Sequence, residues 1–116
     1  MSVLATFLKA VESKDEASLS EVIHEDYKFI PHVNDQVYTK SDMLAVCMSD
    51  SFTRHNGRIV YENEEIAVDH AVVSFANGST SEAVLSVHTI QDGKIMSTET
   101  GATPLAEDYN VVGTEA

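Results

Sequence analysis

A tight turn between two strand-forming runs is the feature that most constrains how this chain can fold. The turn is Gln91-Asp92-Gly93-Lys94, and the runs beside it are Ser81–Ile90 and Lys94 to about Ala102. Asp-Gly between two β-rich runs is a strong hairpin signal, because Gly takes the positive φ that such a turn needs. The two runs therefore predict a long antiparallel hairpin, against which the earlier part of the chain packs.

Two further strands are predicted before this hairpin. The first starts at Arg58 and extends as far as Val68, and the second is the β-rich run Ala71–Ala76. Asp69-His70 is expected to be the turn between them, and Asn77-Gly78 has the sequence of a second hairpin turn. The second half of the chain therefore predicts four antiparallel strands joined by tight turns.

Three amphipathic helices are predicted in the first half of the chain. The first covers about Val3–Ser13, where apolar residues recur at helical spacing and Ser2 can serve as the N-cap. A second, short helix is expected after Asp15, and a third after Ser41. An amphipathic helix needs a surface for its apolar side, and the following sheet can provide it.

One strand is expected between the second and third helices, at Asp26–Val33. Pro31 cannot donate to a strand ladder, so this is an edge strand, a bulge or the end of a strand. The segment 49–57 is expected to be a polar connection. Helices in one half and strands in the other predict an α+β fold, with three N-terminal helices on the concave face of a curved, mostly antiparallel sheet.

Length, charge and cysteine content limit the kinds of protein that this chain can be. At 116 residues it predicts a single domain, 1–116, in which 105–116 is a tail. A net charge of −12 argues against nucleic acid and anionic membrane as partners. No apolar run approaches the roughly 20 residues that span a bilayer. Cys47 is the only cysteine and excludes an internal disulfide, so the cytoplasm is the expected compartment.

The order of these elements resembles the NTF2-like superfamily, a cystatin-like α+β cone that includes SnoaL-type cyclases, ketosteroid isomerases and scytalone dehydratases. The opening, FLKAVESKDEASLSEVIHEDYKFIPH, is similar to the family's helix, Asp-led second helix and acidic pair, here Phe7–Val11, Asp15 and Glu25-Asp26. Asp92–Ile95 resembles the turn before the family's last strand. The resemblance spans residues 3 to 104 and implies a homodimer formed through the outer face of the sheet.

The catalytic residues of ketosteroid isomerases are not matched. Laid ungapped against that pattern, the oxyanion tyrosine falls at Phe7, and the general-base aspartate falls at Pro31, or at Ile30 with one gap. The supporting tyrosine falls at Cys47 and the protonated carboxylic acid at Ser86. The resemblance therefore implies the family's shape without this chemistry, and function must be argued from the site itself.

His88 and His32 are the candidate catalytic residues. Counting back from the Asp92-Gly93 turn, as the family does, places His88 and Ser86 on the inner face of the sheet. A histidine there can act as a general base near neutral pH. The alternative is a half-buried histidine that only hydrogen-bonds to a strand neighbour or a water. His32 follows Pro31 and can already lie in a loop, which favours the structural alternative.

A mostly apolar pocket for a small hydrophobic molecule is expected inside the cone. The residues expected to contact the ligand are Phe7, Val11, Tyr27, Cys47, Ser86 and Thr98. Along the last strand, Met96, Thr98, Thr100 and Ala102 are expected to face inward. Tyrosines in strands are more often packing residues. Cys47 has no basic neighbour in sequence and is expected to be a buried, inert thiol. Glu99 is expected on the outer face, and the acidic run 62–65 at a solvated strand end.

Two functions stay open. Because HxxxH, HExxH, CxxC, GxGxxG and GxxxxGK[ST] are absent from the sequence, neither a metal nor a cofactor is expected. The first function is cofactor-free proton transfer, of isomerase, dehydratase or cyclase type, with His88 as the base. The second is a non-catalytic module whose pocket only binds or whose sheet only assembles. Two polar groups converging in the pocket would favour an enzyme, whereas a single polar anchor would suit a binding module.

Overall fold

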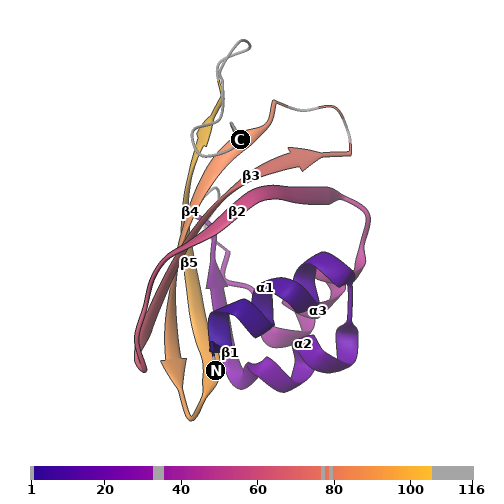
Figure 1. Cartoon of the computed structure of the whole chain (residues 1–116). Helices are drawn as coiled ribbons and strands as arrows, with labels where there is room; N and C mark the ends of the chain where they lie inside the picture. The colour runs from indigo at the N-terminus through magenta and orange to yellow at the C-terminus, as the bar shows by residue number, and fades with distance from the viewer. Residues whose placement is uncertain (1, 33–35, 77, 79, 106–116) are drawn as a thin grey trace.

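The computed structural model describes residues 2–32, 36–76, 78 and 80–105 of the chain. Within this described part, the helices are α1 (Val3–Ser13), α2 (Glu16–Val22) and α3 (Lys40–Met48). The strands are β1 (Ile23–Ile30), β2 (Phe52–Glu62), β3 (Ile66–Phe75), β4 (Glu82–Gln91) and β5 (Lys94–Pro104). The helices lie together on one side of a curved sheet, which confirms the predicted α+β arrangement (Figure 1).

The strands form a sheet in the order β1-β5-β4-β3-β2. From β2 to β5 each strand is antiparallel to the next, whereas β1 runs parallel to β5. β1 is an edge strand that ends just before Pro31, as expected for a residue without an N–H. It begins at Ile23, earlier than the predicted Asp26, because Ile23 already pairs with Ile95. The predicted strand end at Val33 lies outside the described residues.

The hairpin of β4 and β5 is confirmed. Gln91 pairs with Lys94, and the two residues between them, Asp92 and Gly93, have φ of 56° and 72°. Positive φ at both positions is typical of a type I′ turn, whose twist matches that of the flanking strands.

A bulge near this hairpin corrects one prediction. Thr89 pairs with Ser97 but Ile90 pairs with Ile95, so Met96 is an extra residue in β5. The bulge shifts the alternation of faces. Ile95 is therefore the fully buried residue at this end of β5, and Met96, expected to face inward, is only half-buried.

The predicted turn at Asp69-His70 is wrong. β3 runs unbroken through both residues, and the chain turns at 63–65 instead. The Asn63 side-chain carbonyl accepts hydrogen bonds from the N–H groups of Glu65 and Ile66, both at 2.8 Å. Asn side chains stabilise turns in this way by replacing a backbone acceptor.

The predicted polar connection at 49–57 is also wrong in its second half. β2 starts at Phe52, which pairs with Phe75, and continues through Thr53, Arg54 and His55. The pairing with β3 draws these polar residues into an edge strand, where one side remains open to water.

The helix starts follow the sequence closely for α1 and less closely for α3. The Ser2 hydroxyl accepts from the Ala5 N–H at 2.9 Å, as predicted for an N-cap. The Glu62 carboxylate accepts from Ser2 and from the Leu4 N–H, so it joins the end of β2 to α1 and is more than a solvated strand end. α3 is capped by Thr39, in a capping box with Asp42, and not by Ser41.

The core lies between the helices and the face of the sheet that they cover. Its fully buried members include Leu4, Leu19, Ile23, Ala67 and Ile95. No helix in the described part of the chain is long and apolar enough to cross a membrane.

Several predictions fall on residues outside the described part. They are the loop residues 34 and 35, Asn77 of the Asn77-Gly78 turn, and the tail from 106 onward. Gly78 itself has φ +82° and donates its N–H to the Phe75 carbonyl at 3.1 Å. Leu105, assigned to the tail, donates its N–H to the Ser81 carbonyl at 2.9 Å.

Candidate functional site

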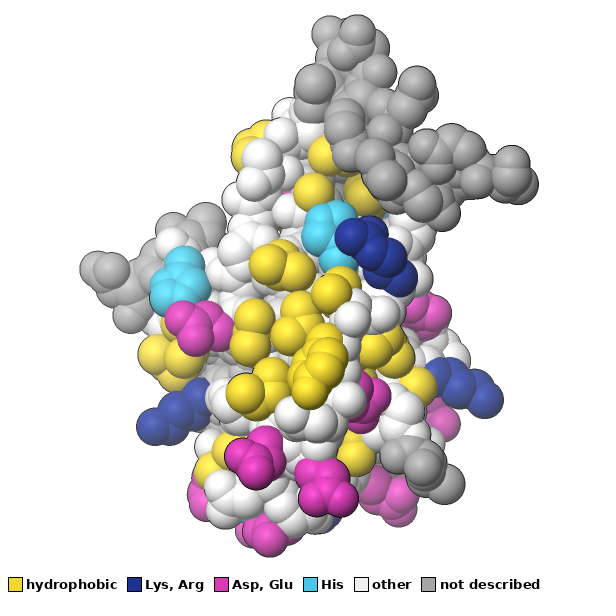
Figure 2. Space-filling view, turned by 60° about the vertical axis from the view of Figure 1, so that its left-hand side comes forward, with side chains coloured by type: hydrophobic (Ala, Val, Ile, Leu, Met, Phe, Trp, Pro, Cys, Tyr) yellow, Lys and Arg dark blue, Asp and Glu magenta, His cyan; other side chains and the backbone are white. Residues whose placement is uncertain are grey.

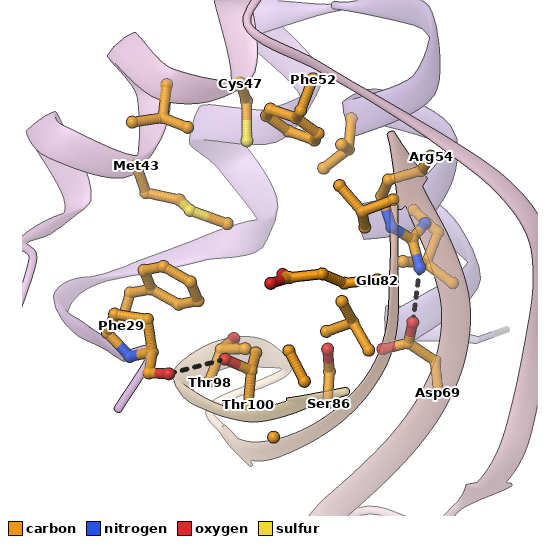
Figure 3. A pocket seen from close by; sticks show the side chains of 18 of the residues that line it. Phe29, Met43, Cys47, Phe52, Arg54, Asp69, Glu82, Ser86, Thr98 and Thr100 are labelled. Carbon is orange, nitrogen blue, oxygen red and sulfur yellow. Dashed lines mark hydrogen bonds and ion pairs between the residues drawn. The ribbon is translucent and has the colours of Figure 1, made fainter. Parts of the chain in front are cut away.

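A cavity of about 860 Å³ lies between the helices and the inner face of the sheet. Its walls are mainly hydrophobic, and the side chains that form them come from α1, α3 and all five of the described strands (Figure 3). The apolar wall residues include Phe7, Leu8, Val11, Phe29, Met43, Val46, Phe52, Val73, Phe75 and Val84. A space of this size and composition is typical of a small-molecule pocket.

Most of the residues expected in the pocket do line this cavity. They are His88, His32, Phe7, Val11, Cys47, Ser86 and Thr98. Alternation along β4 and β5 brings Ser86, His88 and Thr98 to the inner face, while Phe7 and Val11 approach from α1.

Tyr27 is the exception among the expected ligand-contacting residues. Its side chain is buried in the core and does not line the cavity. Burial raises the pKa of the Tyr27 phenol, and the nearby Thr98 hydroxyl lowers it in part. No described residue accepts or donates a hydrogen bond of normal geometry at this hydroxyl. Tyr27 is therefore a packing residue in this structure.

His88 is buried, and both of its ring nitrogens have partners. Nε2 lies 2.6 Å from Oδ1 of Asp69, and Nδ1 lies 2.8 Å from the Thr98 hydroxyl. An ionised carboxylate only accepts hydrogen bonds, so Nε2 donates its proton to Asp69. The Phe7 ring meets the imidazole edge-on, with 5.5 Å between ring centroids. The histidine is thus fixed in orientation from three sides.

Asp69 connects this histidine to a buried arginine. Its second oxygen, Oδ2, accepts from the Arg54 guanidinium at 2.6 Å (Figure 3). The Asp69 side chain is 1% exposed and the Arg54 side chain 12%. Arg54 also reaches the half-exposed Glu12 at 3.5 Å. The result is a polar chain across four adjacent strands, from Thr98 on β5 through His88 and Asp69 to Arg54 on β2.

Asp69 and Arg54 were not predicted as site residues from the sequence. Asp69 was assigned to a turn and Arg54 to a connection. A signal was present, because residues 66–75 form an almost continuous strand-forming run once the turn is placed at Asn63. An aspartate on the inner face of such a strand requires a buried partner of opposite charge.

Cys47 lines the cavity as a thiol of low reactivity. Burial raises its pKa to about 11, although the Arg54 charge acts in the opposite direction. The thiolate is the nucleophilic form of cysteine, so its population at neutral pH is very small. The expectation of a buried thiol is met by its 2% exposure.

His32 lies at the rim of the cavity, away from the hydrogen bonds of His88. Its backbone φ is +62°, and its Nε2 lies 2.8 Å from Oε2 of Glu99. Both side chains are more than half exposed. No hydrogen bond within the described residues links His32 to the chain of groups around His88. The two candidate histidines therefore do not form one catalytic pair.

Glu82 was not identified from the sequence as a site residue. It is the first residue of β4, and its carboxylate extends into the middle of the cavity (Figure 3). Among the described residues, no group of three or more His, Cys, Asp or Glu side chains is arranged to hold a metal ion.

Comparisons with known proteins give the fold. No family model and no curated protein matches the sequence. An NTF2-like protein of unknown function from Cytophaga hutchinsonii is 13% identical, with a TM-score of 0.73 and 88% of each chain covered. A candidate ketosteroid isomerase from Kribbella flavida is 10% identical, with a TM-score of 0.75, and the match covers 94% of this chain and 81% of that one. An LEH-like epoxide hydrolase from Mycobacterium tuberculosis is 10% identical, with a TM-score of 0.69 and coverages of 87% and 80%.

The chain therefore has the cone-shaped fold of NTF2-like proteins, as the resemblance implied. At these identities the likeness concerns the fold, since one fold of this kind carries many unrelated activities.

Proposed function

We propose that this protein binds a small hydrophobic molecule in the cavity and moves a proton on it without a cofactor, in a reaction of isomerase, dehydratase or cyclase type. The observation that carries the proposal is the buried chain Arg54–Asp69–His88–Thr98, which borders a mainly apolar cavity. Oriented, partly desolvated acid–base groups beside an apolar binding space are the arrangement that proton transfer requires.

Each of these four hydrogen-bonded side chains has a distinct proposed role. With its proton on Nε2 and donated to Asp69, a neutral His88 presents Nδ1 as the basic nitrogen. Asp69 stabilises the positive charge that develops when Nδ1 takes a proton, and Arg54 holds Asp69 in place. The Thr98 hydroxyl, bonded to Nδ1, takes a proton from the substrate while it passes its own to the imidazole. Reversal of the relay returns a proton to another atom of the substrate.

The second candidate function is binding alone, and one observation favours it. His88 is 1% exposed and both ring nitrogens are already hydrogen-bonded. A histidine whose two ring nitrogens are both hydrogen-bonded can have a purely structural role, in which it stabilises the sheet. The cavity would then hold an apolar ligand with Ser86 and Thr100 as further hydroxyl contacts on its wall.

Identification of a co-purifying ligand tests the binding half of the proposal. We expect native mass spectrometry of freshly purified protein to show an adduct of a few hundred daltons, since about 860 Å³ suits a molecule of that class. Substitution of Val84 by Trp, which fills the cavity from β4, should abolish the adduct. Substitution of the exposed Val37 by Trp is the matched control. Retention of the adduct in the Val84 variant would contradict binding in this cavity.

We further propose that two copies associate through the outer face of the sheet. Figure 2 shows hydrophobic side chains gathered on one face of the molecule, beside histidine and basic groups. Tyr61, Val68 and Val87 are adjacent across β2, β3 and β4, and Leu85 lies beside Gly101. Tyr61, Leu85 and Val87 are 56%, 46% and 39% exposed. An apolar sheet face left open by the helices is a typical interface for association.

Sedimentation velocity at micromolar concentration should therefore give twice the monomer mass. We expect Leu85→Glu, which places a charge on this face, to weaken the dimer at least about tenfold. Val37→Glu, at an exposed apolar residue elsewhere, should leave the dimer unchanged. A monomer at every accessible concentration of the unmodified protein would refute the dimer.

A further inference from the structure

We infer that the molecule bound in the cavity carries a basic amine and that Glu82 is the carboxylate that pairs with it. The inference rests on the proposed binding function and names the chemical class of the ligand. It starts from a group that the proton-transfer proposal does not use.

The fold directs the Glu82 side chain into the cavity. Glu82 lies on the same side of β4 as Val84, Ser86 and His88, because alternate residues of a strand share a face. Figure 3 shows its carboxylate extended toward the side of the cavity that carries Phe29 and Met43. The residue as a whole is half-buried.

This carboxylate has no counter-ion among the residues that the structure describes. No hydrogen bond or ion pair joins the Glu82 carboxylate to any described residue, although its backbone pairs with β3 and β5. Arg54 is the only lysine or arginine among the described residues that line the cavity. Its guanidinium is already bonded to Asp69 at 2.6 Å and reaches Glu12 at 3.5 Å. An unpaired carboxylate directed into a mainly apolar cavity is free to form a charge-assisted hydrogen bond with a cationic donor, and here the ligand can supply that donor.

The electrostatics of the cavity favour a cationic ligand over an anionic one. Among the described residues that line it, Asp69 and Glu82 supply two carboxylates, whereas Arg54 supplies one guanidinium. The chain as a whole carries −12, which also attracts cations from solution. Phe29, Phe52 and Phe75 line the same space, and the faces of aromatic rings attract ammonium groups. A ligand carboxylate would meet repulsion and would find Arg54 already paired.

Two polar groups of the cavity, Glu82 and His88, lie far apart along β4. Glu82 and His88 are six residues apart, which corresponds to about 20 Å between Cα atoms at the rise of a strand. The two side chains therefore act on different atoms of a ligand. Glu82 anchors an ammonium group at one end, and the apolar body of the molecule extends toward Ser86 and His88.

Three compounds of six carbon atoms that carry different polar groups test this inference. At pH 7, hexylamine is a cation, 1-hexanol is neutral and hexanoate is an anion. We expect the amine to bind at least about tenfold more tightly than the alcohol, and hexanoate to bind most weakly, in NMR titrations of ¹⁵N-labelled protein. Glu82→Gln should lower the affinity for hexylamine about tenfold and leave that for 1-hexanol within about twofold.

Glu21→Gln is the matched control, because it removes the same charge from an exposed position on α2. It should leave all three affinities unchanged, and thermal melting of both variants checks that they fold. Equal binding of amine and alcohol to the unmodified protein, or equal effects of the two substitutions, would overturn the amine inference. Binding of 1-hexanol would in that case leave the apolar pocket intact. Failure of all three compounds to bind would overturn the pocket proposal as well.

Discussion

Replacing His88 with glutamine is expected to slow proton transfer about 10²–10⁴-fold while the fold is retained, since this is the usual contribution of a general base. The glutamine amide nitrogen can take the place of Nε2 and donate to Asp69, which lies 2.6 Å from Nε2 in the structure. The amide has no basic nitrogen to take the place of Nδ1. The rate is measured as incorporation of deuterium from D₂O into the co-purified ligand, followed by mass spectrometry.

Thr98→Val provides the second arm of this experiment. It removes the hydroxyl that bonds to Nδ1 and keeps the shape of the side chain. If Thr98 relays the proton, this variant should also lose most of its turnover while its ligand affinity stays within a few-fold. A His88→Gln protein that exchanges deuterium at the unmodified rate would refute the catalytic role. It would leave His88 as a stabilising residue of a binding module.

Replacing Asp69 with alanine is expected to lower the free energy of unfolding by about 3–5 kcal/mol, because it leaves buried polar partners without their acceptor. The Arg54 guanidinium is 12% exposed and would keep only the 3.5 Å contact to Glu12. The His88 Nε2–H would lose its 2.6 Å partner. For a domain of this size the melting temperature should fall by about 10–25 °C. Urea denaturation at constant protein concentration measures the loss.

Two further variants separate a charge effect from a packing effect. Glu25→Ala removes an exposed carboxylate from β1 and should change stability by less than about 0.5 kcal/mol. The double variant Arg54→Met, Asp69→Leu removes both charges and should cost less than Asp69→Ala alone. A loss below about 1 kcal/mol for Asp69→Ala would show that the ion pair does not hold the sheet together.

The parts of the fold that depend on residues close together in the sequence were predictable. The Asp92-Gly93 turn fixes two φ angles locally, and the α1 stripe and its Ser2 cap lie within one helical segment. The Asp69-His70 turn was predicted because two polar residues interrupt a β-rich run. In the structure Asp69 stays in the strand because Arg54 and His88, from the strands on either side, provide partners for its two oxygens. That compensation is non-local and has no signature at Asp69 itself.

The candidate site was predictable where it depends on regular strand alternation, and not where it depends on a bulge or on packing between elements. Counting residues back from a reliable turn placed Ser86 and His88 on the inner face, because strand alternation is strict there. The count failed at Met96, where a bulge adds one residue. Tyr27 was expected to contact the ligand, yet helix packing buries it in the core. Glu82 gave no signal, because an isolated glutamate at a strand start has the same sequence pattern whether it faces water or a cavity.

The parallel pairing of β1 with β5 has a consequence for the order in which this protein can form. Ile23 pairs with Ile95, so the first strand finds its sheet partner only after the other three strands have followed it in sequence. During synthesis β1 emerges long before β5, and its ladder to that strand stays open meanwhile. Closing so long a loop costs chain entropy before any contact compensates, which slows folding. The wall that carries Thr98 arrives in the same step, so the sheet edge and the cavity are completed together and late.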